Sequence, residues 1–190
     1  ESFIHEAGDS YAVLTGNTVR EPSGSELTEA ALTLQKEMYA ADPRVADGTQ
    51  SYALYGKSIF ALYNSRGLDL EDKASYAGCA GFALMHEGDE MYDGSEDKDG
   101  SLEDFDLKEI AGKAVEDAAS TIGAASVPSG KYHVVFTGKA FAALLTTFSS
   151  VFSSEAAQKG LSLLSGREGE KIAADFVTIT DDPLHEKSLV

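Results

Sequence analysis

Residues 57–87 read "KSIFALYNSRGLDLEDKASYAGCAGFALMHE" and contain the pattern from which an antiparallel sheet is predicted. Polar and apolar residues alternate in "KSIFALY" (57–63) and again in "ASYAGCAGFALMHE" (74–87). "NSRG" (64–67), between the two runs, has the composition of a turn. Because alternation with a period of two is typical of half-buried strands, we expect two or three antiparallel strands within residues 45–87.

Small residues interrupt the second of these runs. Gly78 and Gly81 indicate either a bulge or a close approach of another segment to the strand. Cys79 lies among alanines and glycines, so we expect a small buried hydrophobic residue rather than a reactive thiol.

A helix is predicted upstream of the strands. Ser23 and Glu26 have the spacing of a capping box, and Pro43 excludes helical geometry at Asp42. Apolar residues recur between these limits at helical intervals: Leu27, Ala31, Leu34, Met38 and Ala41.

A second helix is predicted after an acidic segment. Residues 93–104 read "DGSEDKDGSLED" and are expected to form an exposed loop. Asp106 is placed to cap the following helix, with Glu109 at the third position. The apolar face of that helix is expected to contain Leu107, Ile110, Ala111, Ala114, Val115, Ala118 and Ile122.

These elements predict an α+β fold, with an antiparallel sheet and three or four helices packed on one side of it. Further strands are expected at residues 131–137 and 175–180, and a helix at 139–152. Residues 1–22 are expected to be an irregular lead-in, and residues 23–190 to form a single domain.

The composition excludes some classes of function. The chain has 190 residues, 32 acidic against 15 basic, for a net charge of −17, which would repel a nucleic-acid backbone. It has a single cysteine, which fits a reducing compartment, and no apolar run long enough to cross a bilayer. We therefore expect a cytoplasmic protein with no direct contact to nucleic acid or membrane.

The acidic segment suggests one cation site. Residues 95–106 place Asp97 and Asp99 at the third and fifth positions of an EF-hand loop. The first position is Ser95 and the twelfth is Asp106, so both end ligands depart from the motif. Asp97, Asp99 and Asp106 are therefore weak candidates for calcium, and a solvated hairpin tip is the favoured interpretation.

The histidines do not form a zinc motif by themselves. His5–Glu6 and His86–Glu87 both lack the second histidine that zinc peptidases carry on the same helix. The hydroxyl-rich stretch "LLTTFSSVF" (144–152) lacks the partners of a nucleophilic serine. Its residue chemistry favours a packed helix whose hydroxyls bond back to carbonyls one turn earlier.

Three motifs in fixed order resemble the TldD/PmbA family, also called modulators of DNA gyrase. They are "PSGKYHVVFTGKAFAALL", "SSEAAQKGLSLLSGREGEKIA" and "FVTITDDP". The resemblance extends from about Asp106 to Pro183 and is fainter upstream. It implies a link to intracellular proteolysis and peptide maturation. Family members are about twice as long, so we expect a middle fragment that lacks an N-terminal domain and a C-terminal half.

The resemblance also assigns the hydroxyl-rich helix. In TldD-type members, two leucines lead into His-Glu-x-x-x-His, which binds zinc. Here Leu144 and Leu145 lead into Thr146, Thr147 and Val151 at the motif positions. These side chains are not workable zinc ligands, so the sequence resembles the PmbA (TldE-like) branch and no cofactor is expected.

The expected function follows from this branch. It is a non-catalytic subunit of a metalloprotease complex, paired with a TldD-like catalytic subunit or with a second copy, and in contact with a peptide or an unfolded protein segment. Lys159 and Arg167 are candidate contacts for a peptide or a partner, although solvated charges are the simpler interpretation. Two alternatives stay open: an active metallopeptidase with ligands from the missing C-terminal region, and a calcium-responsive interaction domain.

Overall fold

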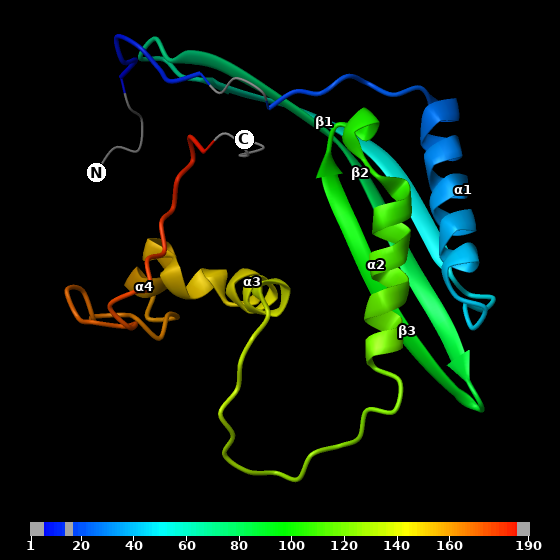
Figure 1. Ribbon diagram of the computed structural model, residues 1–190. Coiled ribbons are helices and arrows are strands. Elements are labelled where there is room, and N and C mark those ends of the chain that lie inside the picture. Colours follow the sequence, from blue (N-terminus) through cyan, green and yellow to red (C-terminus); the bar gives the residue numbers. More distant parts are fainter. Residues whose placement is uncertain (1–5, 14–16, 186–190) are drawn as a thin grey trace. The chain divides into compact units, whose positions relative to one another are not determined.

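The computed structural model describes residues 6–13 and 17–185, which form two compact units (Figure 1). The first unit contains the described residues up to 125 together with 182–185, and the second contains residues 126–181. The sequence predicts a single domain over residues 23–190, and the described residues of this range are divided between the two units. The segment between the second helix and residue 131, which contains proline and serine, separates the two units along the chain.

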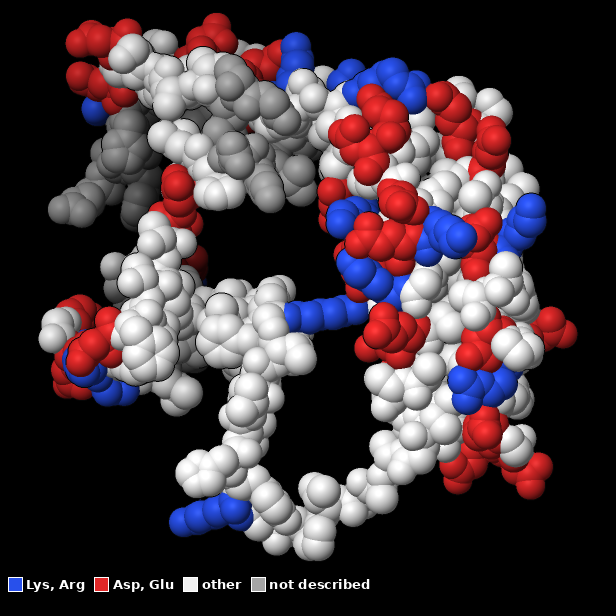
Figure 2. Space-filling view, viewed as in Figure 1, with Lys and Arg blue, Asp and Glu red and all other residues white. Residues whose placement is uncertain are grey.

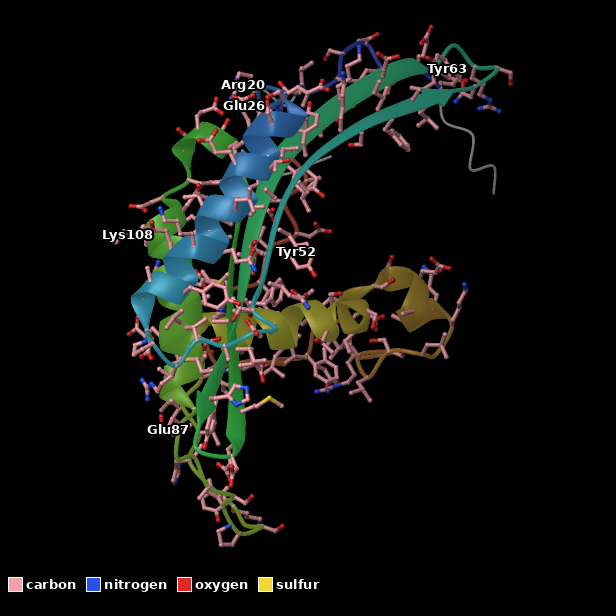
Figure 3. The ribbon with its side chains drawn as sticks, turned by 90° about the vertical axis from the view of Figure 1, so that its right-hand side faces the viewer. Arg20, Glu26, Tyr52, Tyr63, Glu87 and Lys108 are labelled. Carbon is pink, nitrogen blue, oxygen red and sulfur yellow. The ribbon has the colours of Figure 1, made fainter. Side chains whose placement is uncertain are left out.

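The first unit contains α1 (Gly24–Ala41), β1 (Gln50–Tyr63), β2 (Asp69–Glu87), β3 (Glu90–Gly100), η1 (Leu102–Asp104) and α2 (Leu107–Ser120). Its three strands form an antiparallel sheet in the order β1-β2-β3. Gln50 pairs with Phe82 at one end of β1 and Tyr63 pairs with Asp69 at the other. Figure 3 shows Tyr63 at the far end of this long hairpin, beyond the start of α1. The α+β class predicted from the sequence is confirmed.

The exposed loop expected at residues 93–104 is wrong for most of its length, because Glu90–Gly100 forms β3. Glu87 and Glu90 are paired, so only Gly88 and Asp89 make the turn. Gly88 has a φ of 64°, which tight hairpin turns require and which glycine adopts without strain. Because the turn has only two residues, the chain after it runs directly back along β2. The acidic residues of this segment therefore lie alternately on the two faces of a strand.

Both helices of this unit cover the same face of the sheet (Figure 1). Leu34 and Met38 of α1 are buried as predicted, and Ala30 rather than Ala31 completes the stripe. The core between the helices and the sheet consists of Ala30, Leu34, Met38, Val45, Cys79, Ala83, Met85, Ile110, Ala111, Ala114, Val115 and Ala118. Burial of this many apolar side chains is the main source of stability for the unit.

The helix starts are capped as the sequence predicts. Ser23 and Glu26 form a complete capping box at α1. The Arg20 guanidinium donates two hydrogen bonds to the Glu26 carboxylate, with N–O distances of 2.9 and 3.2 Å. Figure 3 shows Arg20 and Glu26 side by side at the start of α1. The Asp106 side chain accepts a hydrogen bond from the Glu109 backbone N–H at 2.9 Å, which caps α2.

Glycines let the helices approach the strands closely. A Cβ on Gly81 would lie 2.9 Å from the Met38 sulfur, and a Cβ on Gly94 would lie 2.1 Å from the Ala118 backbone nitrogen. The strand registers run without a break, so the bulge considered at Gly78 and Gly81 does not form and the close approach does. The position of α2 on β3 therefore depends on the missing side chain at Gly94.

The second unit contains α3 (Gly138–Thr147), η2 (Ser149–Phe152) and α4 (Ser154–Gln158). The strands expected at residues 131–137 and 175–180 do not form, although their composition favours strands. A strand needs a neighbour for its hydrogen-bond ladder, and no described segment pairs with either run. Their side chains are accordingly open: Val135 is 96% exposed and Phe176 is 90% exposed.

Candidate functional site

The site that the sequence singles out lies at the end of α3. Thr137 begins this helix by accepting a hydrogen bond from the Ala140 backbone N–H at 3.2 Å. The helix ends at Thr147, and residues 149–152 continue as a short 3-10 turn rather than the single helix expected over 139–152. Thr146 and Thr147 therefore lie in the last turn of α3, and Val151 lies beyond it.

The polar groups at these positions are used within the unit. The Thr147 hydroxyl donates a hydrogen bond to the Ala143 carbonyl at 2.9 Å, one turn earlier, as the sequence predicts, but no residue of α3 is buried, so the packed helix expected here is not seen. The Val151 carbonyl accepts a hydrogen bond from the Ser162 hydroxyl at 2.5 Å. Ser162 is buried, and its oxygen also accepts from the Leu164 backbone N–H at 3.0 Å. These bonds hold the loop after α4 against η2.

A zinc ion does not fit this donor set. A neutral threonine hydroxyl that already donates to a carbonyl is a poor zinc ligand, and the valine side chain has no lone pair. Within residues 6–13 and 17–185, no three His, Cys, Asp or Glu side chains gather in a way that would hold a metal ion.

Lys159 and Arg167 both pair with carboxylates of their own segment. Lys159 caps α4 and forms an ion pair with Glu155, one turn earlier. The Arg167 Nε lies 2.8 Å from the Glu170 carboxylate. Both basic side chains remain largely exposed, so each could exchange its local partner for another carboxylate.

The three calcium candidates are divided between two elements. Asp97 and Asp99 lie on β3 and, two residues apart, share one face of the sheet. Asp106 lies after η1, where its side chain caps α2. The loop on which the calcium hypothesis was based is therefore replaced by a strand, and the candidate ligands do not surround a common point in an EF-hand loop.

Of the two histidine–glutamate pairs, the structure describes His86–Glu87 completely. His5 lies outside the described residues. His86 is on β2 opposite Met91, and its backbone N–H donates to the Arg44 carbonyl at 3.0 Å. The Glu87 carboxylate lies 3.1 Å from the Arg44 guanidinium, so this residue belongs to a surface ion pair.

Asp42 completes that ion-pair cluster. Its carboxylate lies 2.8 Å from the Arg44 guanidinium and also accepts the Arg44 backbone N–H at 2.8 Å. These hydrogen bonds to Arg44 lower the pKa of Asp42 to about 2. The cluster fastens the end of α1 to the β2–β3 turn, which is a structural role.

Two family models match consecutive parts of the chain. Residues 17–122 match the central domain of the PmbA/TldA metallopeptidases, and residues 129–190 match their C-terminal domain. The chain belongs to the PmbA/TldD family. The gap between the two matches, at residues 123–128, coincides with the boundary between the two compact units.

Similar proteins agree with this assignment. A Thermotoga maritima crystal structure, described as that of a candidate modulator of a DNA gyrase, has a TM-score of 0.76 and 28% identity over 89% of this chain and 40% of its own. TldE from Thermococcus kodakarensis has the same fold, with a TM-score of 0.73 and 21% identity over 100% of this chain and 43% of its own. An uncharacterised Methanocaldococcus jannaschii protein is 31% identical over 122 residues, which are 64% of this chain and 28% of that protein. The chain thus spans less than half the length of these relatives.

The structure also reveals features that the sequence did not indicate. The acidic β3 lies next to β2, so it brings Asp97 and Asp99 onto the same sheet as Tyr52 and Phe82. The run of polar residues from Ser95 to Asp99 shows no alternation that would have indicated a strand. No helix of the described residues is long and apolar enough to cross a membrane.

Proposed function

We propose that this chain is a PmbA/TldE-like, non-catalytic part of an intracellular metalloprotease complex that acts in proteolysis or peptide maturation. The observation that carries the proposal is the side-chain chemistry at the end of α3, where Thr146, Thr147 and Val151 are the residues that the family resemblance aligns with the zinc motif. The Thr147 hydroxyl donates to the Ala143 carbonyl, which supports a helix that does not bind a metal ion. Family membership gives the context of a metallopeptidase.

The chain needs a partner for this function. A TldD-like subunit would supply the zinc site, and this chain would complete the walls of the space in which a peptide or an unfolded segment lies. The second unit favours such a role because large apolar side chains on α3 and η2 are exposed in the chain by itself, among them Phe141, Phe148 and Phe152. Lys159 and Arg167 are the proposed contacts for carboxylates of the peptide or of the partner.

A reconstituted complex tests the proposal. The full-length protein would be co-expressed with a TldD-like partner that carries His-Glu-x-x-x-His, and hydrolysis of an unfolded protein would be followed by mass spectrometry. Substitution of the partner's glutamate is expected to abolish hydrolysis. Thr146→Ala and Thr147→Val in this chain are expected to leave the rate within about twofold, because neither removes a ligand.

Two results would overturn the proposal. One is hydrolysis by this chain alone at the rate of the complex. The other is a rate of hydrolysis that falls by more than about tenfold in Thr147→Val while the complex still assembles at full yield. Either would show that this chain contributes reacting groups, and a ligand set from elsewhere in the full-length protein would then be the better explanation.

A further inference from the structure

The face of the sheet opposite α1 and α2 has no covering element within the first unit. Paired residues of antiparallel strands share a face, and Ala53, Cys79, Ala83 and Met85 belong to the face that contacts the helices. The other face therefore carries the residues of the opposite parity, which in this part of the sheet are Gln50, Tyr52, Leu54, Gly78, Ala80, Phe82, Leu84, His86, Met91, Asp93, Ser95, Asp97 and Asp99. We call this surface the open face.

The β1 side of the open face is apolar. Tyr52 is 51% exposed and Phe82 is 45% exposed, and their rings meet edge to face with centroids 5.7 Å apart. Leu54 is also exposed and lies next to Gly78. A Cβ on Gly78 would lie 2.8 Å from Asp99 Oδ1 and 3.4 Å from Leu54 Cδ1, so the Asp99 carboxylate of β3 lies over Gly78, close to the apolar side chains of β1.

The β3 side of the open face is acidic. Asp93, Asp97 and Asp99 are exposed and are the only charged residues among those that define the face. No ion pair joins any of the three to a cation in the described parts of the chain. Partial burial and the nearby Asp97 charge raise the pKa of Asp99.

The helical side of the unit is different. Figure 2 shows basic and acidic side chains interspersed over α1 and α2. Lys113 pairs with Glu109 at 2.6 Å on α2, and Arg20 pairs with Glu26 at the start of α1. Positive charge is thus available on this unit but is absent from the open face, where acidic groups stand beside aromatic rings.

We propose that the open face docks an amphipathic segment of a partner polypeptide, with apolar side chains on one side and lysine or arginine along the adjacent edge. The apolar side chains would contact Tyr52, Leu54 and Phe82, and the basic side chains would reach Asp97 and Asp99. Charge complementarity selects this occupant. A second copy of the chain would bring the three aspartates against their own copies, and a nucleic acid would be repelled. The inference does not depend on whether the chain is catalytic.

Binding of a synthetic peptide tests the inference. The probe is a fluorescent 18-residue helical peptide with leucines on one side and lysines on the other, and the comparison peptide has glutamate in place of every lysine. Affinity for the full chain is measured by fluorescence anisotropy at low salt. We expect the lysine peptide to bind and the glutamate peptide not to bind.

Matched variants locate the binding. The double variant Asp97→Asn, Asp99→Asn is expected to lower the affinity for the lysine peptide by about fivefold or more, because it removes two ion-pair partners. Glu29→Gln with Glu116→Gln removes the same charge from exposed positions on α1 and α2 and should change the affinity by less than twofold. Phe82→Ala should weaken binding through its apolar contact. Amide chemical shifts of the wild-type chain give a second readout, with changes expected at Ala80, Phe82 and Asp97.

Several outcomes would contradict the inference. Equal losses in the two double variants would mean that the peptide responds only to the overall charge of the chain. Equal binding of the glutamate peptide would remove the role of the aspartates. Displacement of the peptide by 1 mM calcium chloride but not by magnesium chloride would assign the aspartates to a metal ion. Shift changes confined to α1 and α2 would place the peptide on the other side.

Discussion

Substitution of Gly94 by alanine is the sharpest test of how the first unit is built. Gly94 is buried on β3, opposite Ala83, and its backbone φ is not in the left-handed region, so the conformation itself would tolerate alanine. The added Cβ would lie 2.1 Å from the Ala118 nitrogen and 2.7 Å from the Ala114 oxygen. Ordinary contacts begin at about 3.4 Å, so α2 would have to move by more than an ångström.

The size of the effect follows from the atoms involved. They are backbone atoms of a helix, which cannot rotate away as a flexible side chain can. Overpacking of a core costs about 1–3 kcal/mol, and we expect the upper end of this range for Gly94→Ala. That loss is a large part of the stability of a small domain, which is about 5–15 kcal/mol. Ala118→Gly should not rescue the variant, because the clash is with the backbone and not with the Ala118 side chain.

Urea unfolding followed by circular dichroism measures this effect. With a slope of about 1–3 kcal/mol/M, the midpoint of Gly94→Ala should fall by about 1 M or more. Gly112→Ala is the matched control, since Gly112 is on α2 and an added Cβ there meets nothing within 4 Å. It should raise stability by about 0.5–1 kcal/mol through helix propensity. A Gly94→Ala midpoint equal to that of the wild type would refute the packing of α2 on β3.

Three further predictions concern other parts of the first unit. Ser23→Ala removes the capping box of α1 and should lower the free energy of unfolding by about 1 kcal/mol in urea titrations, whereas no change would argue against this helix start. Cys79 is 2% exposed and burial raises the pKa of its thiol, so iodoacetamide should modify it much more slowly in the native chain than in urea, as mass spectrometry can follow; equal rates would contradict its burial. The pKa of Asp42 is lowered to about 2 by hydrogen bonds from Arg44, so this contribution to stability is present above about pH 4 and is lost as the pH falls through 2; melting temperatures of the wild type and Arg44→Gln should converge in acid, and a constant difference would count against the pair.

Much of the fold was predictable because local chemistry and tertiary packing agree. The capping residues Ser23 and Asp106 and the apolar faces of both helices are where the sequence places them. The alternation around Cys79 predicted the β1–β2 hairpin and the burial of the thiol. In each case a short-range pattern is sufficient to identify the buried face.

The sequence analysis did not predict β3, because its many charged residues are typical of a loop and its pairing with β2 is not visible in the sequence. Five carboxylates between Glu90 and Gly100 indicate a solvated loop, yet Gly88 provides a turn that returns the chain along β2. The strands expected at residues 131–137 and 175–180 show the opposite error. Their composition favours strands, but a strand forms only where a neighbour supplies hydrogen bonds, and composition contains no information about that neighbour.

The candidate site was predictable only in part. The back-bonded Thr147 follows from general helix chemistry. The assignment of Thr146, Thr147 and Val151 to zinc-motif positions came from the resemblance to a family and not from periodicity, and it stays a prediction. The open face depends on β3, so no sequence pattern could place Asp97 beside Phe82 before the strand order was known.

The zinc content of the full-length protein shows whether α3 binds a metal ion. The protein would be purified without its partner, dialysed against zinc at a defined low concentration, and analysed by mass spectrometry for zinc per chain. We expect much less than one zinc per chain for the wild type, and the same value for Thr146→Ala and Thr147→Val. One zinc per chain that is lost in Thr147→Val, together with peptidase activity that a chelator removes, would contradict the claim that α3 performs no metal chemistry.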